Sequence, residues 1–234
     1  MSKREQIEKA IKDLESQRAM LGDETIAAAI EALRQKLTQI ETEETRIEAA
    51  AAGERKIVTV MFADLSEFSA LAERMDPETV RDLINACFSR LVPIIEKFGG
   101  VVDKFVGDQI IALFGAPRAH ENDPERACRA ALQMMEALAA FNIERGFELG
   151  MHIGINTGLV LAGEIGTGER QAYSVMGDAV NVASRLEELS GWGEILVGAD
   201  TYRLTRAIFK FEAMSPVRVK GKLEPVRVYR LVGV

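Results

Sequence analysis

Cysteine, histidine and long apolar runs are all scarce in this sequence. Its 234 residues include only two cysteines and two histidines, so a zinc site has almost no support and the fold needs no disulfides. Cys87 and Cys128 lie in predicted amphipathic helices, and we expect two buried thiols in a reducing compartment. No apolar run approaches the roughly 20 residues of a membrane span, and no signal peptide opens the chain. We therefore expect a soluble, cytoplasmic protein without a membrane span.

An excess of positive charge is also missing. The net charge of −7 argues against a general nucleic-acid binder, which needs a basic face to neutralise phosphates. A P-loop, a strand-coupled dinucleotide-binding glycine motif and a G-x-S-x-G nucleophile motif are absent too. A local basic pocket is still available for a small anion, because Arg218, Lys220 and Lys222 cluster late in the chain.

Residues 1–53 are rich in alanine, glutamate, glutamine, arginine and leucine, and apolar residues recur there at heptad spacing. The spacing breaks at Gly22-Asp23, where one helix can end and the next begin. We expect either a helical hairpin or a coiled coil between chains, serving dimerisation or signal transmission, with a solvent-exposed linker helix as the alternative. Residues 54–234 are expected to form the globular domain.

The segment from 101 to 115 predicts a tight hairpin that presents charge at its turn. Two apolar runs flank Lys104, Gly107 and Asp108, and a glycine beside an acid permits positive φ and close approach of a ligand. Taken alone, the hairpin fits a metal site and a solvated turn about equally well.

Upstream, Ile57 to Ala63 has the composition of a central strand and ends at Asp64. If this strand lies beside the hairpin, Asp64 and Asp108 converge, and two close carboxylates need a cation between them. Oxygen ligands without a His/Cys cluster point to Mg²⁺ or Mn²⁺. The alternative for Asp64 by itself is a helix N-cap.

The remaining pattern predicts an α+β fold, an antiparallel sheet with helices on one face. Asp76-Pro77 and Asp123-Pro124 mark helix starts, and a turn is expected at Asn156-Thr157-Gly158. Asn181 and Arg185 lie four residues apart on one helical face. We expect a strand at 57–63, a helix at 77–98, the hairpin at 101–115, a helix at 123–143, β structure at 149–166, a strand and helix within 171–191, and strands near 195–198, 208–213 and 226–232.

In this order and spacing, FADLSEFSAL, KFVGDQIIALFG, YSVMGDAVNVASRLE and VKGK resemble the catalytic domain of class III adenylyl cyclases over residues 55 to 232. The resemblance implies a ferredoxin-like βαββαβ core and a head-to-tail homodimer with two composite sites for ATP. It further implies these roles: Asp64 and Asp108 bind two divalent metal ions on one chain, Lys104 and Ser174 of the other read adenine, Asn181 and Arg185 orient ribose and triphosphate, and Lys220 or Lys222, with Lys222 favoured, binds phosphate.

Ser174 departs from the mammalian pattern, which has aspartate there. It resembles a bacterial subclass linked to bicarbonate stimulation, and because serine both donates and accepts, selectivity against guanine is expected to be softer. Guanylyl cyclases carry glutamate and cysteine at the two base-reading positions, so Lys104 favours ATP. The competing readings are a catalytically silent, nucleotide-binding regulatory module and a guanylyl cyclase. An upstream sensor or regulatory domain is an expected partner.

Overall fold

The computed structural model describes residues 30, 33, 53–66, 75–165, 172–218 and 225–234. The chain divides into two compact units, Met1–Glu54 and Arg55–Val234. In the first unit, Ile30 and Leu33 are helical and Ile30 is buried. Among the described residues, no helix is both long and apolar enough to cross a membrane.

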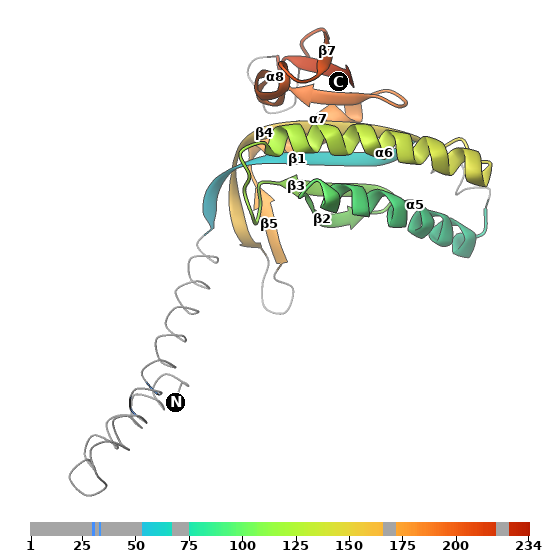
Figure 1. The fold of residues 1–234 in the computed structure, drawn as a ribbon, viewed down its shortest axis with the longest axis horizontal. Coiled ribbons are helices and arrows are strands. Elements are labelled where there is room, and N and C mark those ends of the chain that lie inside the picture. Colours follow the sequence, from blue (N-terminus) through green and yellow to red (C-terminus); the bar gives the residue numbers. More distant parts are fainter. Residues whose placement is uncertain (1–29, 31–32, 34–52, 67–74, 166–171, 219–224) are drawn as a thin grey trace, which may run out of the picture. The chain divides into compact units, whose positions relative to one another are not determined.

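The second unit begins with the predicted βαββαβ order, so this part of the fold prediction is confirmed (Figure 1). Its elements are β1 (Glu54–Ser66), α5 (Pro77–Lys97), β2 (Val101–Val106), β3 (Gln109–Phe114), α6 (Asp123–Arg145), β4 (Gly150–Ile165), β5 (Ala172–Met176), α7 (Asp178–Leu189), β6 (Ile195–Gly198), α8 (Ala199–Thr205), β7 (Lys210–Ala213) and β8 (Val228–Gly233).

The strands form one eight-stranded sheet in the order β2-β3-β1-β4-β6-β8-β7, and β5 pairs with β4 off this path. The pairs β1/β3, β2/β3, β4/β5, β6/β8 and β7/β8 are antiparallel, and β4/β6 is parallel. The sheet is therefore mostly antiparallel, as expected, and the hairpin β2-β3 lies at one edge beside β1.

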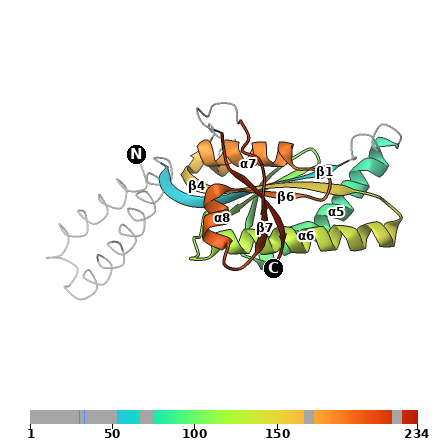
Figure 2. The ribbon, with the colours of Figure 1, turned by 90° about the horizontal axis from the view of Figure 1, so that it is seen from above.

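Helices cover both faces of the sheet, so the prediction of helices on one face only was wrong. Figure 2 shows α7 on one side of the strands and α5 and α6 on the other. Side chains alternate along β1 accordingly: Met61 and Ala63 pack in the cluster with α5 and α6, whereas Val60 and Phe62 pack in the cluster with α7. A strand that is buried on both faces has a nearly continuous apolar sequence, so the sequence of β1 does not show which faces of the sheet are covered by helices.

Two predicted helix starts are confirmed. The Asp76 carboxylate accepts a hydrogen bond from the Glu78 amide at 3.0 Å and caps α5, which begins at Pro77. Asp123 opens α6, although its buried carboxylate accepts from the His120 amide at 2.7 Å instead of capping its own helix.

The predicted turn at 156–158 is wrong, because β4 runs unbroken from Gly150 to Ile165. The polar side chains that suggested a turn are satisfied inside the fold. The Asn156 amide donates to the Ala179 carbonyl at 3.1 Å, and the Thr157 hydroxyl lies 2.9 Å from the hydroxyls of Thr59 and Thr201. The short helix α8 was not predicted.

Candidate active site

The hairpin forms as expected and presents its charged residues at and near the turn. Gly107 adopts φ +65°, and an added Cβ there would meet nothing within 4 Å. Glycine is therefore favoured by backbone conformation and not by lack of space. Asp108 follows at the turn, and Lys104 lies in β2 with its side chain 52% exposed.

The structure brings Asp64 and Asp108 together. Asp64 pairs in register with Gln109, the residue that follows Asp108. Burial, followed by the negative charge of Asp108, raises the pKa of Asp64 to about 6. Each effect disfavours the charged form of the carboxylate, which is the situation that a bound cation relieves.

These two residues suit a site for divalent cations. Mg²⁺ in proteins is commonly held by one or two carboxylates, with substrate phosphates and water completing its shell. No group of three or more His, Cys, Asp or Glu side chains with a metal-site arrangement occurs among the described residues. The donor set fits a metal that arrives with a phosphate substrate better than a closed, all-protein site.

Glu187 is a third carboxylate at this place, and the sequence reasoning missed it. It is buried in α7, and the Gln109 amide donates to it at 3.1 Å. Burial, then the charges of Asp64, Glu188 and Asp108, raises the pKa of Glu187 to about 7. A helical signal was available, since Glu187 stands four residues after the buried Ala183 and shares its face.

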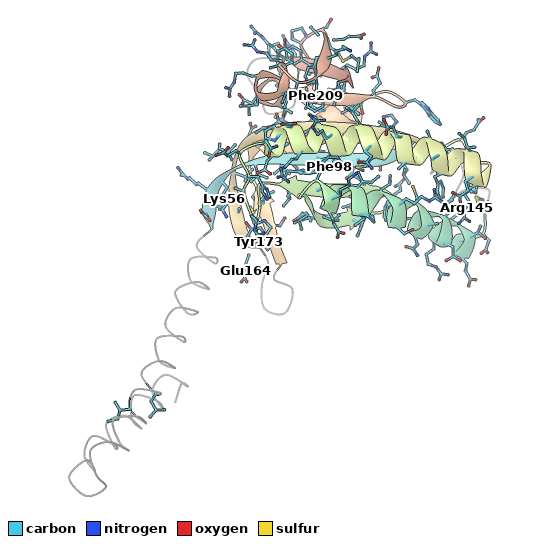
Figure 3. The ribbon with its side chains drawn as sticks, viewed as in Figure 1. Lys56, Phe98, Arg145, Glu164, Tyr173 and Phe209 are labelled. Atoms are coloured by element: carbon cyan, nitrogen blue, oxygen red, sulfur yellow. The ribbon has the colours of Figure 1, made fainter. Side chains whose placement is uncertain are left out.

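The structure also brings together Lys104 and Ser174, which are 70 residues apart. The Lys104 ammonium donates to the Ser174 hydroxyl at 3.4 Å. Ser174 is buried in β5 and pairs with Gly163 of β4. Figure 3 labels Tyr173 and Glu164, which form the next pair along β4 and β5 after Ser174 and Gly163. Asp103 joins this pair and was not predicted.

Asn181 and Arg185 lie on α7, with Asn181 exposed and Arg185 half-buried. The Arg185 guanidinium pairs with Glu188 one turn further on. Of the late basic cluster, Arg218 is exposed, whereas Lys220 and Lys222 lie outside the described residues. The predicted site residues thus gather in two pairs on the hairpin side, Asp64 with Asp108 and Lys104 with Ser174, and one pair on α7.

Residues 51–233 match the family model of the adenylate and guanylate cyclase catalytic domain. Adenylate cyclase 1 of Rhizobium meliloti (strain 1021) is 33% identical over an alignment of 186 positions, and the alignment covers 77% of this chain and 28% of that protein. The adenylate cyclase of Anabaena cylindrica is 33% identical over an alignment of 198 positions, and the alignment covers 79% of this chain and 38% of that protein. The chain therefore spans about a third of the length of these relatives.

Two solved structures resemble the chain closely. The adenylyl cyclase CyaB from P. aeruginosa has a TM-score of 0.75 and 33% identity, with 77% of this chain and 96% of that chain covered. The guanylyl cyclase Cya2 has a TM-score of 0.72 and 33% identity, with 78% and 94% covered. From the matched domain, the shared fold and the sequence identity together, we conclude that this chain belongs to the family of adenylate and guanylate cyclase catalytic domains.

Proposed function

We propose that the chain is an adenylyl cyclase, which converts ATP to 3',5'-cyclic AMP and pyrophosphate. The observation that carries the choice of ATP is the 3.4 Å contact between the Lys104 ammonium and the Ser174 hydroxyl. The adenine edge offers one acceptor, N1, beside one donor, the 6-amino group. An ammonium, which only donates, next to a hydroxyl, which also accepts, suits that edge.

In the proposed reaction, the ribose 3'-hydroxyl oxygen attacks the α-phosphorus. The bond from that phosphorus to the pyrophosphate oxygen breaks, and the hydroxyl proton leaves to water or to the substrate. Asp64 and Asp108 would hold two divalent cations, Mg²⁺ or Mn²⁺, which when bound lower the pKa of the hydroxyl and offset phosphate charge. Asn181 orients the ribose, and Arg185 stabilises charge that develops on the triphosphate.

We further propose that the site is composite and forms between two copies of the chain. Large apolar side chains are about half exposed on the strands beside the site: Phe105 and Val106 on β2, Leu161 on β4 and Met176 on β5. Leu161 and Met176 pair directly across β4 and β5, and neighbouring exposed apolar side chains favour a protein interface. In such a homodimer, Asp64 and Asp108 of one chain act with Lys104, Ser174, Asn181 and Arg185 of its partner.

Turnover of ATP and GTP by the purified full chain, with Mg²⁺ or Mn²⁺, tests the activity. Cyclic AMP formation supports the proposal. Preferred use of GTP identifies the alternative that the likeness to Cya2 raises, a guanylyl cyclase. Nucleotide binding without any turnover identifies a catalytically silent regulatory module instead.

Complementation tests the composite site. Asp64→Ala and Arg185→Ala should each be inactive, and mixing equal amounts should restore roughly a quarter of wild-type activity, because half of the dimers are mixed and each carries one intact site. Arg203→Ala is the matched control, since Arg203 also forms an i,i+3 ion pair on a helix surface. If demonstrated chain exchange restores nothing, Asp64 and Arg185 do not serve one site from opposite chains.

For residues 1–53 we propose a coiled-coil role in dimerisation or signal transmission. Leu33→Asp with Leu37→Asp should lower specific activity in dilute solution and leave it recoverable at high protein concentration, because paired helices raise the effective concentration of the two domains. Activity against concentration, followed together with sedimentation, measures this. Unchanged curves for both would make the segment a passive linker.

The remaining partner proposals follow from the same assignment. An ATP-using domain with two free, buried cysteines suits the cytoplasm, and we expect an upstream sensor or regulatory domain. Bicarbonate stimulation is predicted from Ser174. The rate in sodium bicarbonate compared with sodium chloride at equal pH and ionic strength checks it, and equal rates would contradict it.

A further inference from the structure

Asp103 is a buried carboxylate next to the proposed base-reading pair. Its side chain is only 3% exposed, and aspartate is almost never buried to this extent unless it is paired. Both of its polar contacts run through one oxygen. Oδ2 lies 3.0 Å from the Ser174 hydroxyl and 3.1 Å from the Lys104 ammonium. Its Oδ1 is buried and has no hydrogen-bond partner among the described residues.

An irregularity in β2 places the carboxylate there. Successive side chains of a regular strand point to opposite faces, so Asp103 and Lys104 should not both reach one group. The register with β3 shifts between Val102 and Lys104, which leaves Asp103 as an extra residue in the strand. A bulge of this kind re-aims a side chain. As a result, Asp103 and Lys104 both contact the hydroxyl of Ser174.

These contacts fix the direction of the hydrogen bonds at Ser174. A carboxylate only accepts and an ammonium only donates, whereas a serine hydroxyl has one proton and two lone pairs. The hydroxyl therefore gives its proton to Asp103 and accepts from Lys104. The second lone pair of the Ser174 hydroxyl remains available to a nucleobase. Toward the base, this hydroxyl can therefore only accept a hydrogen bond.

We propose that Asp103 is the positioning residue that makes this site select 6-aminopurines over 6-oxopurines, an inference that rests on the proposed cyclase function. Adenine donates from its 6-amino group, which the oriented Ser174 accepts, and its N1 accepts from Lys104. A 6-oxopurine presents an acceptor at position 6 and a donor at N1, so both contacts are mismatched. Ser174 then distinguishes adenine from 6-oxopurines because it only accepts a hydrogen bond from the base and does not also donate one.

The test compares three triphosphates that differ only near position 6. ATP carries the amino group, inosine triphosphate carries oxygen, and purine riboside triphosphate carries neither. For the wild-type full chain we expect kcat/KM to fall on the order of 10⁴-fold from ATP to inosine triphosphate, because a site built around a hydrogen bond rejects a substrate that cannot form it. Equal use of ATP and purine riboside triphosphate by the wild type would show that the amino group is not read and would overturn the proposal without any variant.

Asp103→Asn keeps the size of the side chain and lets an amide face Ser174, which frees the serine proton for an oxygen at position 6. The ratio of kcat/KM for ATP to that for inosine triphosphate should fall at least tenfold, and Asp103→Ala should act in the same direction. In a Ser174→Ala background, Asp103→Asn should change the ratio no further. Asp82→Ala, which removes an exposed aspartate from α5, is the control and should leave the ratio unchanged.

A uniform loss of activity with all three triphosphates, at a ratio within twofold of wild type, would assign Asp103 a structural role only and overturn the proposal. If the wild type turns over none of them, the cyclase function itself fails. Calorimetric titration of ATP and inosine triphosphate into wild type and Asp103→Asn then measures the ratio of the two affinities. A fall of at least tenfold in this ratio supports the proposal, and a ratio within twofold of wild type overturns it.

Discussion

Gly154 lies where β4 packs directly against the backbone of α7, the helix that carries Asn181 and Arg185. A Cβ added there would lie 2.2 Å from the Ala183 carbonyl oxygen and 2.3 Å from the Glu187 amide nitrogen, whereas ordinary contact begins at 3.4 Å. Both obstacles are backbone atoms and cannot rotate away. Gly154→Ala should therefore move α7 outward by about 1 Å, and a displacement of about 1 Å at a site costs on the order of 100-fold in rate.

The same substitution overpacks the fold, at a typical cost of about 1–3 kcal/mol. For a domain of this size that should lower Tm by roughly 2–12 °C. Cyclic AMP formation and thermal unfolding, measured on the same preparation below the new Tm, separate the two effects. We expect the loss of kcat to persist under conditions where the variant is fully folded.

Gly191→Ala is the matched control. Its added Cβ would lie 3.1 Å from the Glu194 carboxylate, a side-chain group that needs to give by only a few tenths of an ångström while it keeps its bonds to the Gly191 amide and Arg230. This variant should keep nearly wild-type activity and Tm. If Gly154→Ala is as active as Gly191→Ala, the close approach of β4 does not set the position of α7 and the reasoning is refuted.

Three further predictions concern the buried ionisable groups and the metal. Burial raises the pKa of Cys87 to about 11 and that of Cys128 to about 12, so neither thiol should react with a thiol reagent at pH 8 in the native protein and both should react in urea; rapid native labelling would contradict this. The raised pKa of Glu187, about 7, means that the folded state binds this proton more tightly than the unfolded state, so metal-free protein should lose stability as pH rises from about 4.5 to 7. The free energy of unfolding of Glu187→Gln minus that of wild type should therefore be about 1 kcal/mol larger at pH 8 than at pH 5, after allowance for solvent screening. Urea unfolding measures this difference, and an equal value at both pH values would refute the prediction. EDTA should lower turnover on the order of 100-fold, and added Mg²⁺ or Mn²⁺ should restore the wild type but not Asp108→Ala; activity that survives EDTA would count against the metal site.

The sequence alone determined the parts of the fold that local chemistry encodes. Asp76-Pro77 fixed the start of α5 because an aspartate cap and a proline at the first helical position act within one turn. Gly107 beside Asp108 predicted the turn of the hairpin, because the positive φ that the turn requires depends on this one residue being glycine. Apart from α8, the order of strands and helices followed from such signals, together with the apolar runs between them.

Only the tertiary structure decided where polar groups find distant partners. Asn156-Thr157-Gly158 has the composition of a turn, yet it continues β4 because its side chains bond to Thr59, Ala179 and Thr201, which lie far along the chain. Asp103 was not among the predicted site residues, and only the bulge in β2 places its carboxylate beside Ser174. Glu187 likewise meets Gln109 of β3 only because α7 packs against the strands. Local sequence encodes conformation residue by residue, but desolvation and hydrogen-bond direction depend on neighbours that only the folded chain brings within reach.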